Sequence, residues 1–133
     1  MSETGGACPG VLVVEDEVAV REVIIEALAD EGFAAVAARD GAEAVDRLQR
    51  GDRPCVIVLD LMMPRMNGWE FAAWLAERDD ELASIPFVVV TAHGVGHETE
   101  ALGRAAAVLP KPLRLGDLVD AVGQHCAGPS APA

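Results

Sequence analysis

The chain has 133 residues, a length that suits one domain with an ordinary hydrophobic core. Its 22 acidic and 10 basic residues give a net charge of −12, which argues against direct binding to nucleic acid, because few cations are present to neutralise phosphates. No apolar run approaches the ~20 residues of a membrane span, and the N-terminus lacks a signal pattern, so we expect a cytoplasmic protein without membrane insertion. The cysteines form no C-x-x-C pair and predict neither a zinc site nor a disulfide framework.

Small residues with Gly and Pro at both ends predict flexible tails at 1–10 and 128–133, which flank one domain at 11–127. Between the tails, short apolar runs alternate with apolar residues at helical spacing. The predicted strands cover 11–14, 33–38, 55–59, 87–90 and 106–109. The predicted helices carry their apolar positions within 20–28, 44–48, 71–75 and 115–122.

Two local signals complete this pattern. Asp40 stands directly before the second predicted helix, where an aspartate side chain can accept a hydrogen bond from the backbone of the first turn. The segment 94–104 is expected to be a poor helix, because it contains several glycines and each interior glycine costs about 1 kcal/mol relative to alanine.

Polar residues stand at the ends of the predicted strands. Apolar strands that alternate with helices belong to a parallel sheet covered on both faces. The functional groups of such a sheet gather beyond the carboxyl ends of its strands. Three carboxylates, one hydroxyl and one ammonium occupy these positions, and they belong to Glu15, Asp16, Asp60, Thr91 and Lys111.

This set of groups suits phosphoryl transfer. Mg²⁺ prefers one or two carboxylates with phosphate oxygens and water, and an aspartate beside the ion can act as a nucleophile that forms an aspartyl phosphate. An ammonium and a hydroxyl can then hold the phosphoryl oxygens. Each residue alone also has an ordinary explanation: Asp16 can cap the first helix, and most strand-end polar residues are merely exposed. The joint arrangement favours the functional interpretation.

Four sequence segments stand at these strand ends, namely VLVVEDE at 11–17, VLDLMMPRMNG at 58–68, VVVTA at 88–92 and LPKP at 109–112. Together they resemble the response-regulator receiver domain of two-component signalling, and the resemblance runs from about Val11 to Cys126. It implies an α/β fold of the flavodoxin-like type, with a doubly wound sheet of five parallel strands in the order 2-1-3-4-5 and five helices on its two faces.

The resemblance implies a phosphoacceptor and a metal site. Asp60 would accept a phosphoryl group from a phosphohistidine on a histidine kinase or a histidine phosphotransfer domain. Mg²⁺, for which Mn²⁺ is expected to substitute, would be bound by Glu15, Asp16, Asp60 and the backbone carbonyl of Met62. The change in the domain would control binding to an unknown downstream protein or onward phosphotransfer.

Further matched positions surround the phosphoacceptor in the family. Thr91 would donate its hydroxyl to the phosphoryl group, Lys111 would pair with it, and the small Ala92 would leave the pocket open to the donor. The resemblance also implies a cis peptide at Lys111-Pro112, which only proline makes inexpensive, and a tight turn at Gly68.

The sequence departs from the family pattern at Val108, where many receivers carry an aromatic ring that changes rotamer on activation. The usual aromatic output switch is therefore not expected. One hypothesis is that activation orders the glycine-containing segment 94–104, and the alternative is a helix that packing holds unchanged. Trp69 and Trp74 are expected to pack on the third helix. The histidines, which we expect at the surface rather than in a functional site, are His93, His97 and His125.

Two other functions remain open at this point. A pseudo-receiver would bind a partner without phosphorylation, although all five site positions are filled. A hydrolase with an aspartyl-phosphate intermediate usually has a second aspartate two residues after the nucleophile as general acid, and Met62 stands there. We therefore expect self-phosphorylation and slow self-dephosphorylation without turnover of a separate substrate.

Overall fold

Five parallel strands form the centre of the computed structural model, which describes residues 10–78, 81–92 and 105–125. The strands lie in the order β2-β1-β3-β4-β5, and every neighbouring pair is parallel, as predicted. Their bounds are β1 (Val11–Val14), β2 (Ala35–Ala38), β3 (Val56–Asp60), β4 (Phe87–Thr91) and β5 (Ala107–Pro110). Each strand formed at a predicted apolar run, within two residues of the expected ends.

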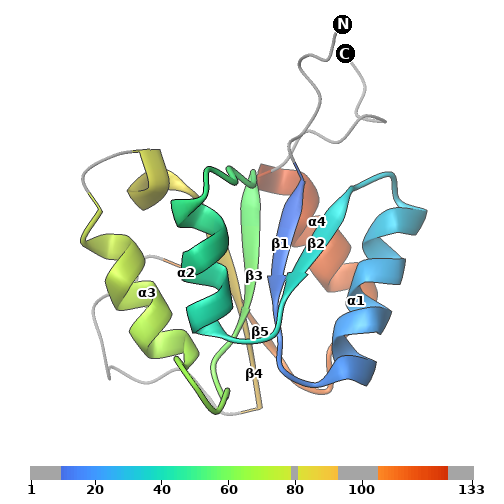
Figure 1. The fold of residues 1–133 in the computed structure, drawn as a ribbon. Coiled ribbons are helices and arrows are strands. Elements are labelled where there is room, and N and C mark those ends of the chain that lie inside the picture. Colours follow the sequence, from blue (N-terminus) through green and yellow to red (C-terminus); the bar gives the residue numbers. More distant parts are fainter. Residues whose placement is uncertain (1–9, 79–80, 93–104, 126–133) are drawn as a thin grey trace, which may run out of the picture.

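Helices cover both faces of this sheet (Figure 1). One face carries α1 (Val18–Asp30) and α4 (Leu115–His125), and the other carries α2 (Gly41–Gln49) and α3 (Gly68–Ala76). A short 3-10 helix, η1 (Glu81–Ser84), precedes β4. Five helices were predicted, and the described ranges contain four α-helices, because the predicted helix in 94–104 lies entirely outside the described residues. The predicted tails also fall almost entirely outside the described residues.

The three central strands are buried on both faces, because side chains alternate between two apolar layers. Leu12 and Val14 of β1 belong to the layer beneath α2 and α3, whereas Val11 and Val13 belong to the layer beneath α1 and α4. Burying one large apolar side chain contributes about 1.5–3 kcal/mol to folding. The continuous apolar runs in the sequence therefore reflect two covered faces.

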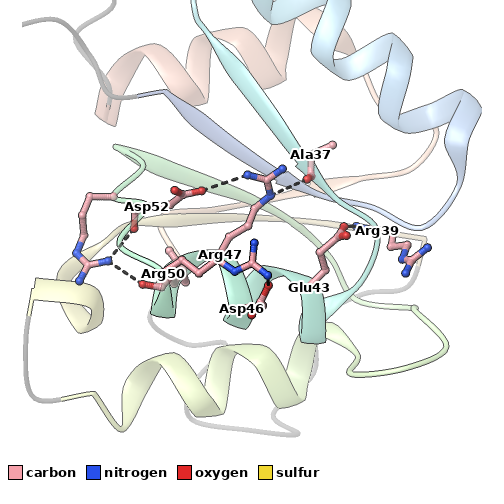
Figure 2. Close-up of polar contacts among 9 residues, drawn as sticks. Ala37, Arg39, Glu43, Asp46, Arg47, Arg50 and Asp52 are labelled. Carbon is pink, nitrogen blue, oxygen red and sulfur yellow. Dashed lines mark hydrogen bonds and ion pairs between the residues drawn. The ribbon is translucent and has the colours of Figure 1, made fainter.

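The helix α2 begins where the sequence predicted a cap. The Asp40 carboxylate accepts a hydrogen bond from the Glu43 amide at 2.8 Å. Farther along α2, Arg47 reaches across to β2 (Figure 2), where its Nε donates to the Ala37 carbonyl at 3.1 Å. A second nitrogen of Arg47 pairs with Asp52 at 3.2 Å. Because β2 is an edge strand, Arg47 covers a carbonyl that no neighbouring strand can bond.

The expectation that the cysteines form no disulfide is wrong for Cys55. This residue lies half-buried directly before β3, and its sulfur is disulfide-bonded. Three cysteines far apart in the sequence carry no pairing signal, since pairing depends on which segments the fold brings together. The other two cysteines lie outside the described residues.

The loop from β3 to α3 passes very close to the first residue of the helix. Gly68 begins α3 after Asn67, whose side chain accepts from the Glu70 amide at 2.9 Å in a capping box. A Cβ atom at Gly68 would lie 2.6 Å from the Asp60 carbonyl oxygen and 2.7 Å from the Leu61 Cα. Both neighbours are backbone atoms, so the glycine is required by close approach.

Gly68→Ala is therefore expected to lower the free energy of unfolding by about 1–3 kcal/mol, because overpacking forces the backbone to shift. Gly116→Ala on α4 is the matched control, because nothing lies within 4 Å of its Cβ position. We expect that variant to be neutral or more stable by up to about 1 kcal/mol, since alanine suits a helix better than glycine. Urea unfolding followed by tryptophan fluorescence measures both, and equal stability of the two variants would contradict the prediction.

Candidate functional site

Three carboxylates meet at the carboxyl edge of the sheet, which lies at the bottom of Figure 1. Glu15 and Asp16 follow β1, and Asp60 ends β3, the strand paired with β1. Each of the three offers an oxygen that lies within 4.8 Å of the others. Glu15 and Asp60 are buried and Asp16 is half-buried. The cap alternative for Asp16 is wrong, because Glu17 occupies the N-cap position of α1.

Lys111 brings a positive charge to these carboxylates. Its Nζ lies 3.3 Å from Asp60 Oδ1 and 3.5 Å from Glu15 Oε1, so one ammonium contacts two buried carboxylates. The backbone amide of Lys111 donates to the Thr91 carbonyl at 2.9 Å, which fixes the start of the β5–α4 loop against the end of β4. The Lys111-Pro112 peptide is cis, as the family resemblance implied.

Thr91 is buried at the end of β4, the neighbour of β3 on the side toward β5. The strand order therefore brings all five predicted side chains to one edge of the sheet. Met62 follows Asp60 by two residues, and its amide lies 3.5 Å from Asp60 Oδ1, while its side chain points to solvent. Ala92 is exposed beside Thr91.

The charged groups of the site shift one another's pKa values. Burial, and then the negative charge of Asp60, raise the pKa of Glu15 to about 7. Burial also raises the pKa of Asp60, although Lys111 opposes this rise through its charge and its hydrogen bond. Burial disfavours the charged form of Lys111, but the carboxylates of Asp60 and Glu15 outweigh it and raise its pKa. The site thus holds more negative charge than Lys111 alone can balance, which favours binding of a further cation.

Other predicted residues lie away from this cluster. Val108 lies exposed on the edge strand β5, and His125 is the exposed last residue of α4. The other two histidines lie outside the described residues. Trp69 and Trp74 lie on α3 and pack against the apolar layer beneath it, as expected.

Sequence reasoning missed Arg21. Its guanidinium donates from α1 to the Glu15 carbonyl at 3.0 Å, and the Glu17 amide donates to Glu15 Oε2 at 3.2 Å. These two bonds hold the backbone and the side chain of Glu15 at the strand end. The position of Arg21 in the first turn of α1 is the only sequence signal for this contact, because its partner is a backbone carbonyl.

An apolar cleft adjoins the acidic cluster. It has a volume of about 400 Å³ and lies between α1 and the segment 111–115. Val20, Val23 and Leu113 are among its lining side chains, and Lys111 lines it as well. Lys111 thus belongs both to the acidic cluster and to the wall of the cleft.

A family model for the response regulator receiver domain matches residues 11–123. The chain belongs to this family. The receiver domain is 41% identical over 111 residues to the response regulator MprA of Mycolicibacterium vanbaalenii, and the match covers 82% of this chain and 46% of that protein. It is 40% identical over 111 residues to the MprA of Mycobacterium tuberculosis strain H37Rv, with 82% and 46% covered. The chain therefore spans about half the length of the curated relatives it matches.

Solved structures share the fold of this receiver domain. A response regulator receiver protein from Pseudomonas putida superposes with a TM-score of 0.80 at 28% identity, covering 90% of this chain and 98% of that one. The response regulator TrrA from Thermotoga maritima, in complex with Mg²⁺-BeF, gives a TM-score of 0.75 at 25% identity, with 86% and 96% covered. Within the described ranges, no helix of the receiver domain combines the length and apolarity that a membrane crossing needs.

The raised pKa of Glu15 predicts a pH-dependent stability. The folded state holds this proton up to about pH 7, whereas the unfolded chain releases it near 4.5, so stability falls as pH rises through this window. Glu15→Gln removes the titration, and we expect its stability advantage over the unsubstituted protein to grow from pH 5 to pH 8 by about 1–3 kcal/mol. Urea unfolding in EDTA measures this advantage. Glu22→Gln on the exposed face of α1 is the control, and a Glu15→Gln profile parallel to it would contradict the prediction.

Proposed function

We propose that Asp60 of this receiver domain accepts a phosphoryl group from a phosphohistidine in a Mg²⁺-dependent reaction. One observation carries the proposal: a buried aspartate at a strand end lies 3.3 Å from a lysine ammonium and shares its site with two more carboxylates. The donor would be a histidine kinase or a histidine phosphotransfer domain, and the apolar cleft beside Lys111 supports a protein as the donor.

The side chains suit each step of such a transfer. A carboxylate oxygen of Asp60 attacks phosphorus, the bond from phosphorus to the donor's imidazole nitrogen breaks, and the electron pair of that bond returns to the imidazole. Lys111 lies close enough to Asp60 to pair with the phosphoryl oxygens as they arrive. Thr91, at the end of the adjacent strand, is the proposed hydroxyl donor to the same oxygens.

The acidic cluster fits a divalent cation. Hard cations such as Mg²⁺ and Mn²⁺ bind carboxylate and carbonyl oxygens, and Glu15, Asp16 and Asp60 offer three such oxygens within 4.8 Å of one another. These residues, with the backbone carbonyl of Met62, are the proposed ligands. When bound, the ion would supply positive charge against the negative charge of the carboxylates and the phosphoryl group. The complex of TrrA with Mg²⁺-BeF supports the same class of ion here.

Two other functions account less well for this site. A pseudo-receiver needs no phosphoacceptor, whereas this chain buries Asp60 and Glu15 together despite their mutual repulsion. A hydrolase with many turnovers needs a general acid beside the nucleophile, and the Met62 side chain points to solvent without a titratable group. We therefore propose a cytoplasmic signalling module without turnover of a separate substrate, whose phosphorylation controls a downstream protein or onward phosphotransfer.

Intact mass after treatment with acetyl phosphate and Mg²⁺ tests the phosphoacceptor. We expect one phosphoryl adduct on the unsubstituted protein and none on Asp60→Asn, because an amide cannot form the acyl phosphate. Asp52→Asn removes an exposed aspartate and should keep the adduct. Absence of an adduct on the unsubstituted protein would favour the pseudo-receiver, and sustained release of phosphate from a phosphomonoester would favour the hydrolase.

The proposed metal ligands make the reaction dependent on a divalent cation. EDTA is expected to abolish the adduct, and either Mg²⁺ or Mn²⁺ should restore it. Asp16→Asn is expected to raise the Mg²⁺ concentration needed for half-maximal phosphorylation at least about tenfold, since it removes a charged ligand. The time course of adduct formation across a Mg²⁺ series measures this shift. An equal rate in EDTA and in Mg²⁺ would argue against a metal site.

A further inference from the structure

The loop between Asp60 and α3 is held from outside the acidic site. At its base, the Gly68 amide donates to the Leu61 carbonyl at 3.0 Å. Its far side contacts a different part of the chain, the start of α2. There the Gly41 amide donates to the Met66 carbonyl at 2.9 Å, and Arg65 pairs with Asp40. The loop that carries Met62 is thus attached both to α3 and to α2.

The Arg65–Asp40 contact has two points of attachment. Arg65 Nε lies 2.7 Å from Asp40 Oδ2, and a terminal nitrogen lies 3.4 Å from Oδ1. Asp40 is buried and also caps α2, so its carboxylate is held in place by the Glu43 amide. The hydrogen bond from Arg65 is the largest of several effects that hold the pKa of Asp40 below its usual value. A fixed, charged acceptor of this kind restrains Arg65 although most of the arginine side chain is exposed.

The fit between the loop and α2 is close. A Cβ atom at Gly41 would lie 2.5 Å from the Met66 carbonyl oxygen and 2.8 Å from the Met66 side chain. The loop therefore lies directly against the first residue of α2. Because Arg65 stands three residues after Met62 in a short loop, a shift at Arg65 moves the backbone that carries the proposed metal-binding carbonyl.

We infer that the Arg65–Asp40 ion pair is a positioning device that holds the backbone of Met62 toward Asp60 and thereby sets the affinity of the site for a divalent cation. This inference rests on the proposed function. Neither residue touches the acidic cluster in the described structure, so both act through the loop. Outer partners that orient metal ligands typically change metal affinity 10–100-fold when they are removed.

The direction in which Arg65→Ala changes the affinity for a divalent cation distinguishes a loss of positioning from a loss of charge alone. Arg65 is a cation near an acidic site, so losing its charge alone would strengthen the binding of Mg²⁺ or Mn²⁺. Loss of positioning has the opposite effect, because the Met62 carbonyl is no longer held in place. Arg65→Ala therefore weakens cation binding if the pair positions the loop, and leaves it unchanged or strengthens it if the pair is only a surface contact.

The test is a Mn²⁺ titration of the full chain followed by the electron paramagnetic resonance signal of free Mn²⁺. Arg65→Ala is expected to weaken binding about tenfold or more. Arg65→Lys, which keeps the charge and one donor, should recover part of the affinity. Arg50→Ala is the matched control, because it removes the same charge from the C-cap of α2, where Arg50 pairs with Asp46 at 2.9 Å. This control should bind Mn²⁺ as the unsubstituted protein does or slightly more tightly.

Two further measurements exclude a general structural effect. In an Asp40→Asn background, which keeps a capping side chain, Arg65→Ala should cause little additional loss of Mn²⁺ affinity, because the pair is already broken. Phosphorylation of Arg65→Ala by acetyl phosphate should need more Mg²⁺ for half-maximal rate but reach the same rate at saturating Mg²⁺. Unchanged or tighter Mn²⁺ binding by Arg65→Ala overturns the inference alone. Failure of the unsubstituted protein to bind Mn²⁺ or to become phosphorylated overturns the proposed function with it.

Discussion

A single lysine ammonium lies between two buried carboxylates at the edge of this sheet, and the rest of the site depends on that contact. Removing Glu15 and Asp60 from water is unfavourable, and their proximity adds repulsion. Lys111 offsets part of this cost through its contacts at 3.3 and 3.5 Å. The pKa of Glu15 is still raised to about 7, so the balance is incomplete. The remaining negative charge favours a further positive charge at this site.

The order of the strands creates this arrangement. Because β1 and β3 are parallel neighbours in register, the residues that follow them are forced together although 45 positions separate Glu15 from Asp60 in the sequence. β4 places Thr91 on the other side of β3, and Lys111 comes from the loop after the edge strand β5. The long lysine side chain spans the remaining distance. A hydrogen bond from the Lys111 amide to Thr91 ties the loop to β4 and directs the lysine toward the carboxylates.

Most of the fold could be predicted from the sequence because local signals, such as apolar runs and helix caps, agree with one another. Runs such as Val11–Val14 and Phe87–Thr91 are continuous and rich in β-branched residues, which is typical of a strand covered on both faces, and Asp40 caps the helix that it precedes. The disulfide at Cys55 was not predicted, since local sequence carries no information on pairing. The attachment of the 61–67 loop to α2 was also not predicted, because an arginine in a polar loop usually has only water as its partner. Both depend on segments that meet only in the folded chain.

The sequence by itself determined the layers, the strand positions and which residues stand at the strand ends, because these follow from apolar periodicity and from motifs that resemble one family. Only the tertiary structure decided how the charges act on one another. The ionisation of Glu15 depends on the burial of its carboxylate and on its distance from Asp60, and neither is a property of local sequence. Likewise, Arg65 forms an ion pair only because the fold places the buried Asp40, at the start of α2, next to it. Coulomb interaction and desolvation depend on separation in space, and separation in space is what folding sets.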